Sequence, residues 1–164
     1  MNLSLTARSL SVIGLATGLA LALPAHGQAS APPYGPEVSH QVAAKIVAGA
    51  LEEARKRGWR LAVAVVDPHG ALVHFEKIDD TQTSGPHIAI EKARTAAMFR
   101  RPSRVFEEGL AKRPAYLGLP GVTPIIGGLP IIVDGKVVGG VGASGAASEE
   151  DEQAVMAGLL VLTR

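Results

Sequence analysis

The order of apolar patterns along the chain predicts an α/β fold of the α+β type, with a central antiparallel sheet flanked by helices. Two pairs of short apolar runs, at 60–77 and 129–141, each enclose a turn sequence that favours a β-hairpin. Amphipathic stretches with helical spacing precede, separate and follow these pairs. Hairpins make a sheet antiparallel, and helices must then cover its faces to bury its apolar side chains.

The first helix is expected over 37–57, after a Pro/Ala-rich lead-in at 28–36 that is expected to be mobile. Its apolar side chains return at helical spacing, and Gly58 is a typical C-terminal stop. The first hairpin follows, with strands at 60–66 and 71–77 around the tetrad D-P-H-G. The Pro and Gly of this tetrad suit the second and fourth positions of a type I turn.

The second helix is expected over 87–100, and its two faces differ. Its alanines and Ile90 share one face, and these side chains are small enough for the helix to press closely against a sheet. The opposite stripe carries four larger side chains: His87, Glu91, Arg94 and Met98. Pro102 ends the helix, and Ser103 is expected to cap a short helix that reaches Leu110.

A Gly/Pro-rich loop occupies 112–128, and loops of this length in a compact domain are commonly functional or disordered. In the second hairpin, Asp134-Gly135 forms the turn between β-branched runs. The last helix is expected from an N-cap at Ser148 to about Leu162. Because it is apolar nearly all round, it is typical of a central helix or of one in a subunit interface, and we expect a homo-oligomer.

The first 27 residues are predicted to be a cleavable signal peptide. A lone Arg8 precedes an apolar run from Val12 to Leu23, which is too short for a membrane span of about 20 residues. Small residues before Gln28 suit cleavage between Gly27 and Gln28. We therefore expect a periplasmic or secreted protein with no stable membrane insertion after cleavage. An uncleaved membrane anchor is the alternative.

Charge and cysteine content narrow the range of functions. Removing residues 1–27 takes away Arg8 and lowers the formal net charge from +1 to 0, so we expect no nucleic-acid partner. The chain has no cysteine, which excludes disulfides, thiolate chemistry and Cys-ligated zinc. It also excludes covalent haem attachment through Cys-x-x-Cys-His, so any haem would be held non-covalently.

The sequence contains no motif for nucleotide binding, for a nucleophilic serine or for a zinc hydrolase. A G-x-S-G turn at 142–145, before the last helix, offers backbone N–H groups that could hold a carboxylate or a haem propionate. His87 is the most favourable histidine for ligand binding, because it lies on the outer stripe with Arg94 and could bind an iron. The remaining histidines of the mature chain are expected to be exposed or structural: His40, His69 and His74.

Three blocks of the sequence resemble the GlcG/HbpS family of haem-binding proteins, whose module also forms the C-terminal domain of PduO-type proteins. In family order they read LAVAVVDPHGALVHFEKIDD, AIEKARTAAMFRRPS and GGLPIIVDGKVVGGVGASGAASEEDEQAVMAGL. The resemblance covers nearly the whole of 37–164. It implies a profilin-like domain that binds haem non-covalently and assembles into oligomers. Some exported members are described as binding or degrading haem and sequestering iron.

Candidate haem contacts are named from this chain's own residues, and the resemblance itself does not support a histidine at position 87. His87 is the expected axial ligand of the iron, and it stands where members carry a small residue before the A-x-x-K-A-R-T-A block. Lys92 or Arg94 is expected near a propionate. Thr123, in the 112–128 loop, is an alternative haem neighbour.

Three functions follow from these observations. The leading hypothesis is an exported haem-binding protein that takes part in haem or iron sequestration or sensing. The second is an enzyme that degrades haem or processes a small acid beneath the Gly/Pro-rich loop, although the sequence shows no matched acid–base pair. The third is a PAS- or profilin-like structural or sensory module that holds a small ligand or a partner protein.

Overall fold

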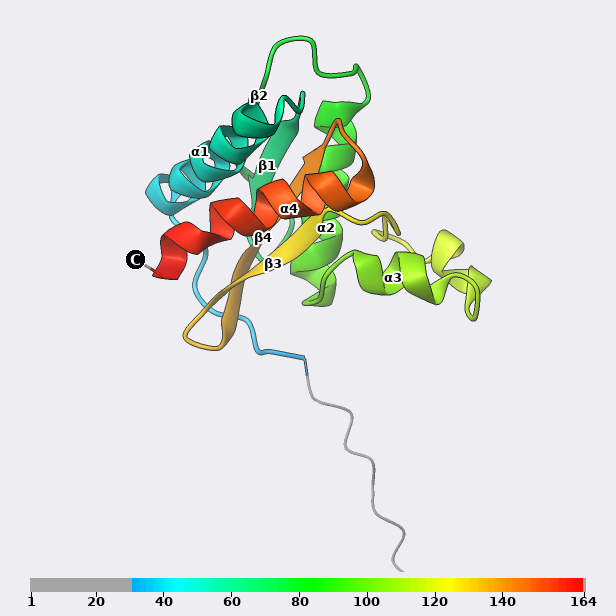
Figure 1. Ribbon diagram of the computed structural model, residues 1–164. Coiled ribbons are helices and arrows are strands. Elements are labelled where there is room, and N and C mark those ends of the chain that lie inside the picture. The colour runs from blue at the N-terminus through cyan, green and yellow to red at the C-terminus, as the bar shows by residue number, and fades with distance from the viewer. Residues whose placement is uncertain (1–30, 164) are drawn as a thin grey trace, which may run out of the picture. The chain divides into compact units, whose positions relative to one another are not determined.

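The computed structural model describes residues 31–163, so the predicted signal peptide lies outside the described residues. Four strands form one antiparallel sheet in the order β2-β1-β4-β3. The pairs β1–β2 and β3–β4 are the two predicted hairpins, and β1 also pairs with β4. Helices α1 and α4 cover one face of this sheet and α2 covers the other (Figure 1). The bounds are α1 His40–Arg57, β1 Ala62–Val66, β2 Leu72–Lys77, α2 Gly85–Phe99, α3 Arg104–Gly109, β3 Gly128–Val133, β4 Lys136–Ser144 and α4 Ser148–Leu159.

The larger core lies between the sheet and the α1–α4 layer. Ile46, Val47 and Leu51 of α1 are fully buried there, as are Val63 and Val65 of β1. Ile46 and Val47 are adjacent, and Leu51 lies four positions after Val47, so the three fall on one side of the helix as the amphipathic pattern predicted. Gly58 ends α1 in the left-handed conformation, with φ 76°.

Helix α2 packs directly onto β4 through small residues. Its alanines at positions 89, 93, 96 and 97 are all fully buried. A Cβ added to Gly140 or Gly142 of β4 would lie 2.3 Å from the backbone oxygen of Ala93 or Ala89. Since this distance leaves no room for a side chain, only glycine permits the close contact of helix and strand. The predicted small-residue face of α2 is confirmed.

The two hairpin turns agree with their predicted chemistry. In the first, Gly70 N donates to Asp67 O at 3.1 Å, as in a β-turn. In the second, Asp134 and Gly135 have φ values of 49° and 72°, as a type I′ turn requires. Strand β4 continues to Ser144, three residues beyond the predicted run.

The described end of the lead-in differs from the mobile segment expected from its composition. Gly35 N donates to Val137 O at 2.8 Å, and Val137 N donates to Pro33 O at 2.9 Å. The reason is that β1 ends opposite Gly140, which leaves the first residues of β4 with a free edge. The lead-in occupies that edge.

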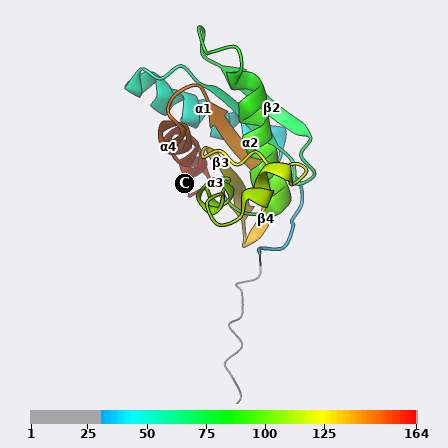
Figure 2. The ribbon, with the colours of Figure 1, turned by 90° about the vertical axis from the view of Figure 1, so that its right-hand side faces the viewer.

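The Gly/Pro-rich loop is held against α2 and α3 (Figure 2). Thr95 of α2 accepts a hydrogen bond from Thr123 N at 2.8 Å and donates to Gly121 O at 3.2 Å. Ser103 precedes α3, as predicted, but its hydroxyl does not cap the helix and instead donates to Ile125 O at 2.7 Å. The loop is therefore anchored along its second half.

Helix α4 buries only part of the apolar surface that the sequence predicted for it. Its N-cap is Ala147, one residue before the predicted cap, and it gives way to a 3-10 helix at Leu160. Val155 is fully buried, whereas the side chains of Met156 and Leu160 remain about half exposed. Within residues 31–163, no helix is both long and apolar enough to cross a membrane.

Candidate ligand-binding site

The outer stripe of α2 is accessible along its whole length. His87 and Met98 are exposed, and Arg94 is partly exposed. His87 and Met98 lie at opposite ends of the helix, about 16 Å apart at 1.5 Å per residue. The stripe therefore offers two separate places for a ligand, one at each end of α2.

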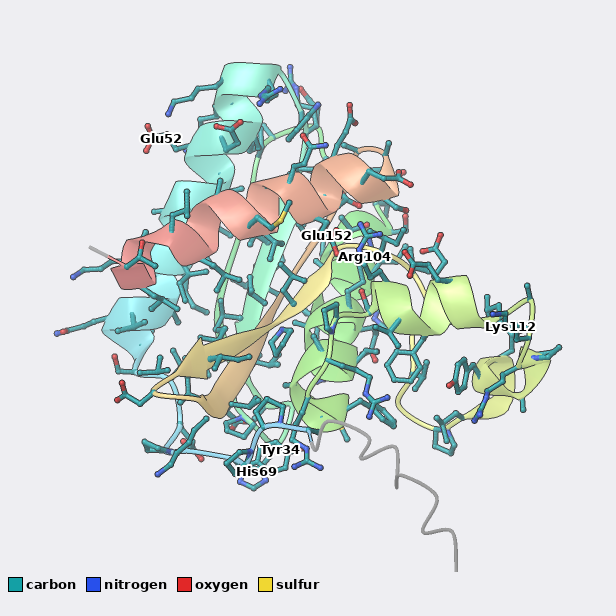
Figure 3. All side chains as sticks on the ribbon, turned by 60° about the horizontal axis from the view of Figure 1, so that its bottom comes forward. Tyr34, Glu52, His69, Arg104, Lys112 and Glu152 are labelled. Carbon is teal, nitrogen blue, oxygen red and sulfur yellow. The ribbon has the colours of Figure 1, made fainter. Side chains whose placement is uncertain are left out.

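An open groove with a volume of about 540 Å³ lies at the Met98 end of α2. Its walls come from the lead-in, the first hairpin turn and the helix: Tyr34, Gly35, Pro36, Glu37, Pro68, His69 and Met98. Figure 3 shows Tyr34 and His69 next to each other in this region. Small-molecule and cofactor sites typically have volumes of about 300–1,000 Å³, so the groove has a suitable size.

The hairpin turn that carries His69 is fixed by hydrogen bonds. The Asp67 carboxylate accepts from His69 N at 2.8 Å and from Ala71 N at 2.9 Å. Arg94 Nε donates to Gly70 O at 2.9 Å, which ties the turn to α2. The backbone of His69 is therefore held in place, while its side chain is exposed to the groove.

The opposite wall is held in a similar way. Tyr34 Oη donates to Met98 O at 2.7 Å. The guanidinium group of Arg100 lies 5.0 Å from the centre of the Tyr34 ring, and it also donates to Pro32 O at 3.1 Å. The groove thus combines apolar surface with an imidazole, a thioether and the acidic residue Glu37, and two guanidinium groups adjoin it.

The structure separates the residues that the sequence analysis grouped as a site. Arg94 adjoins the groove, but His87 is exposed at the other end of α2 and does not line it. Thr123 is partly buried, and its backbone N–H is bound to Thr95 on the flank of the helix. His69, which the sequence analysis treated as an exposed turn residue, belongs to the groove. Its position between Pro68 and Gly70, in a turn, was the only local signal.

The position of Lys92 does not match the propionate contact expected from the sequence. Its side chain is only 1% exposed, and its ammonium group pairs with Asp151 Oδ2 at 2.8 Å. It also donates to Ala143 O at 3.0 Å. On the helical wheel Lys92 lies close to the buried alanine face, so it points toward β4 and α4. This placement argues against Lys92 as a propionate contact and gives it a structural role.

The backbone N–H groups after the G-x-S-G turn are bound by carboxylates of the chain itself. Ala146 N donates to Asp151 Oδ1 at 3.1 Å, and Ala147 N donates to Glu150 Oε2 at 3.0 Å. Burial raises the pKa of Asp151 above its usual value, and the charge of Lys92 partly offsets this. The anion site predicted here is therefore filled from within the protein.

A second acid of α4, Glu152, binds a cation from α3. Arg104 Nε donates to both carboxylate oxygens of Glu152 at 3.0 Å, and Figure 3 shows the two side chains together. These hydrogen bonds raise the pKa of Arg104. Neighbouring acids of α4 thus hold α2 and α3. Among residues 31–163, no group of three or more His, Cys, Asp or Glu is placed to hold a metal ion.

Fold and site together define a class of protein: an α+β domain with a four-stranded antiparallel sheet and a ligand-sized groove at one end of α2. Residues 38–160 match the family described as "Haem degrading protein HbpS-like". The chain is 40% identical to protein GlcG of Escherichia coli K12 over 108 residues, which cover 65% of this chain and 81% of GlcG. It belongs to the GlcG/HbpS family, as the three sequence blocks predicted.

Solved structures agree with this assignment. A double mutant of Streptomyces reticuli HbpS has 30% sequence identity and a TM-score of 0.74, covering 86% of this chain and 97% of that one. PduOC, crystallised as a complex with haem, has a TM-score of 0.68 over 75% of this chain and 93% of its own. Its identity is 21%, so this second likeness shows the fold alone.

Proposed function

We propose that this chain is an exported protein that binds haem non-covalently in the groove at the Met98 end of α2. Membership of a family described as haem-degrading, together with the haem complex of PduOC, supports a haem-related function. The observation that carries the location is the groove itself. It is the place where Tyr34, His69 and Met98, from three distant segments, line one cavity of about 540 Å³.

The residues present in the groove suit haem. Histidine and methionine are both known axial ligands of haem iron, and His69 and Met98 supply one of each. Tyr34 and the prolines offer apolar surface for the macrocycle. Arg100 brings positive charge beside the groove, where a haem propionate would find a partner. Arg94 also lies there, although its guanidinium group is paired with Glu91 at 2.6 Å. Haem bound there would supply its iron as the redox-active centre.

His87 remains the alternative iron ligand. It lies on the same stripe of α2, and its exposed ring is open to solvent. The groove favours His69, because that side chain lines it together with Tyr34 and Pro68. Thr123 is a neighbour of α2 on its other flank and remains a candidate contact for a ligand placed there.

A hemin titration of the purified protein tests this proposal. We expect a Soret band that saturates with hemin. His69→Ala should lower the affinity about tenfold or shift the band, and His87→Ala, which changes an exposed histidine at the other end of α2, is the matched control. A changed spectrum in His87→Ala with an unchanged one in His69→Ala would move the site to the other end of α2. No saturable band in the unmodified protein would overturn haem binding.

Haem turnover is a second candidate, supported by the family description alone. Incubating the haem-loaded protein with a reductant and oxygen tests it. Loss of the Soret band with release of biliverdin or free iron would indicate degradation. A stable band would favour sequestration or sensing.

The predicted signal peptide is the ground for proposing export, and we propose that residues 1–27 are removed. The protein recovered from the cell envelope or the medium should then begin at Gln28 or within a few residues of it, as measured by N-terminal sequencing. Recovery of the intact chain from the membrane would instead support the uncleaved anchor.

We also propose that the protein is a homo-oligomer. Met156 near the end of α4 and Leu160, the first residue of the 3-10 helix that follows, are 48% and 57% exposed. Such exposed apolar side chains suit contact with a second copy. Light scattering should give a mass of at least two chains, and Met156→Lys should reduce it. A monomeric mass for the unmodified protein would contradict the proposal.

A further inference from the structure

Edge strand β2 and the first turn of α1 bring two histidines into direct contact. His74 Nδ1 lies 3.2 Å from His40 Nε2, and the two rings meet edge to face with their centres 5.0 Å apart. On the other side of the same ring, His74 Nε2 lies 3.0 Å from Glu76 Oε1. The three side chains form a continuous row, which we call the His40–His74–Glu76 row.

This row lies on the face of the sheet away from α2. His74 and Glu76 are register partners of Val65 and Val63, whose side chains belong to the core under α1 and α4. Register partners on adjacent strands point to the same side of a sheet. The groove proposed above for haem is lined by other residues, so the two sites share no side chain.

The carboxylate of Glu76 determines where the protons of the row lie. An ionised carboxylate only accepts hydrogen bonds, so His74 Nε2 carries the proton that points at Glu76. The lone pair of His74 Nδ1 then faces His40 Nε2. Metal-binding histidines commonly have this arrangement, in which a carboxylate on the far nitrogen orients the ring and makes the near nitrogen more basic.

We propose that His40 Nε2 and His74 Nδ1 bind a divalent transition-metal ion that prefers imidazole, such as Zn²⁺, with water completing the coordination. Two nitrogens bound to one tetrahedral zinc at about 2.0–2.1 Å are about 3.3 Å apart, close to the 3.2 Å separation observed here. On binding, the proton of His40 moves to its Nδ1, which frees the Nε2 lone pair. Glu76 is a positioning residue rather than a ligand.

Exposure and chemistry agree with this site. His40 lies at the exposed start of α1, and the side chains of His74 and Glu76 are 19% and 47% exposed, so an ion can reach the pair from solvent. Imidazole nitrogen suits Zn²⁺, Cu²⁺ and Ni²⁺, whereas Mg²⁺ and Ca²⁺ prefer oxygen ligands. Because Glu76 binds the far nitrogen, the row presents two ligands to the ion, which agrees with the absence of a three-ligand group among residues 31–163.

Isothermal titration of the haem-free, tag-free protein with Zn²⁺ tests the proposal. We expect one ion per chain, with the affinity falling at least tenfold in His40→Ala and about tenfold in Glu76→Ala. His69→Ala and His87→Ala are matched controls and should bind Zn²⁺ as the unmodified protein does. Mg²⁺ should give no binding. Absence of Zn²⁺ binding in the unmodified protein, or full affinity in His40→Ala, would overturn the site.

A spectroscopic measurement separates this pair from other metal-binding positions. Electron paramagnetic resonance of Cu²⁺ at one ion per chain should show two coupled imidazole nitrogens, and only one in His40→Ala. His40 is exposed, so this variant should fold normally, and hemin binding by it should be unchanged. An unchanged nitrogen pattern in His40→Ala would refute the site even if Zn²⁺ still bound. The result does not depend on whether the protein binds haem.

Discussion

The two faces of helix α2 differ in what their side chains contact. On the inward face, Ala89 and Ala93 lie against a glycine-bearing strand, and Lys92 is paired with Asp151 from a helix 59 positions further along the chain. On the outward face, His87 and Met98 are exposed. Within residues 31–163, no buried side-chain nitrogen or oxygen lacks a hydrogen-bond partner.

This difference shows how one helix can serve both the fold and a ligand. The inward face leaves no room for added atoms and holds a buried ion pair, so changes there should act on stability. The outward face has room for substitution, so changes there should act on binding. Measuring stability and hemin affinity for each variant tests whether the two faces differ in this way.

The largest effect should come from breaking the buried pair. Lys92→Met leaves the Asp151 carboxylate buried without its cation, and we expect the free energy of unfolding to fall by about 3–5 kcal/mol. Urea denaturation measures it. The double variant Lys92→Met with Asp151→Leu should lose less than Lys92→Met alone, because no charge is then left unpaired. An equal or larger loss in the double variant would argue against the pair as the cause.

The same pair predicts a pH dependence. The pKa of Asp151 is raised by burial, and removing Lys92 should raise it further. A raised carboxyl pKa contributes stability that is present below the unfolded value of about 3.9 and is lost as the pH rises through the folded value. Lys92→Met should therefore lose more stability than the unmodified protein as the pH rises over that range. Parallel unfolding curves at every pH would contradict this.

A somewhat smaller effect is expected where α2 meets β4. Gly142→Ala places a Cβ 2.3 Å from Ala89 O, and the helix must move away, at a cost of about 3 kcal/mol. Gly118→Ala is the matched control, since a Cβ there meets nothing within 4 Å, and its stability should change by less than about 0.5 kcal/mol. Similar losses in the two variants would mean that the close contact is not the constraint.

A change at Arg94 is expected to affect both stability and hemin binding. Arg94→Gln removes the hydrogen bond to Gly70 O that ties the first hairpin turn to the helix, which should lower stability by about 1 kcal/mol. Hemin affinity should also fall, because the groove loses a neighbouring cation. Thermal unfolding and hemin titration of this variant measure the two effects separately, and unchanged hemin affinity would place the propionates elsewhere.

The smallest changes in stability should occur on the outward stripe. Met98→Ala and His87→Ala alter exposed side chains at opposite ends of α2, and we expect each to change stability by about 0.5 kcal/mol or less. Only Met98→Ala should weaken hemin binding, since Met98 lines the groove. Loss of hemin binding in His87→Ala alone would instead support His87 as the iron ligand, as predicted from the sequence.

Much of the fold could be predicted because its signals are local. Periodicity and turn residues located both hairpins and the main helices, and the alanine face of α2 was recognised from its spacing alone. The same spacing places Lys92 beside Ala89 on the inward side, so its burial was also open to prediction. Its positive charge led instead to the prediction of a propionate contact. The partner of that charge, Asp151, could not be found from local pattern.

The sequence by itself determined the order of elements, the two faces of α2, the absence of thiol chemistry and the membership of the GlcG/HbpS family. Only the tertiary structure decided which charges pair and where a ligand fits. The groove joins Tyr34, His69 and Met98, and the proposed metal pair joins His40 and His74, in each case across segments distant in sequence. The reason is physical: periodicity reports which side of its own element a residue faces, whereas a site depends on which other elements pack against that side.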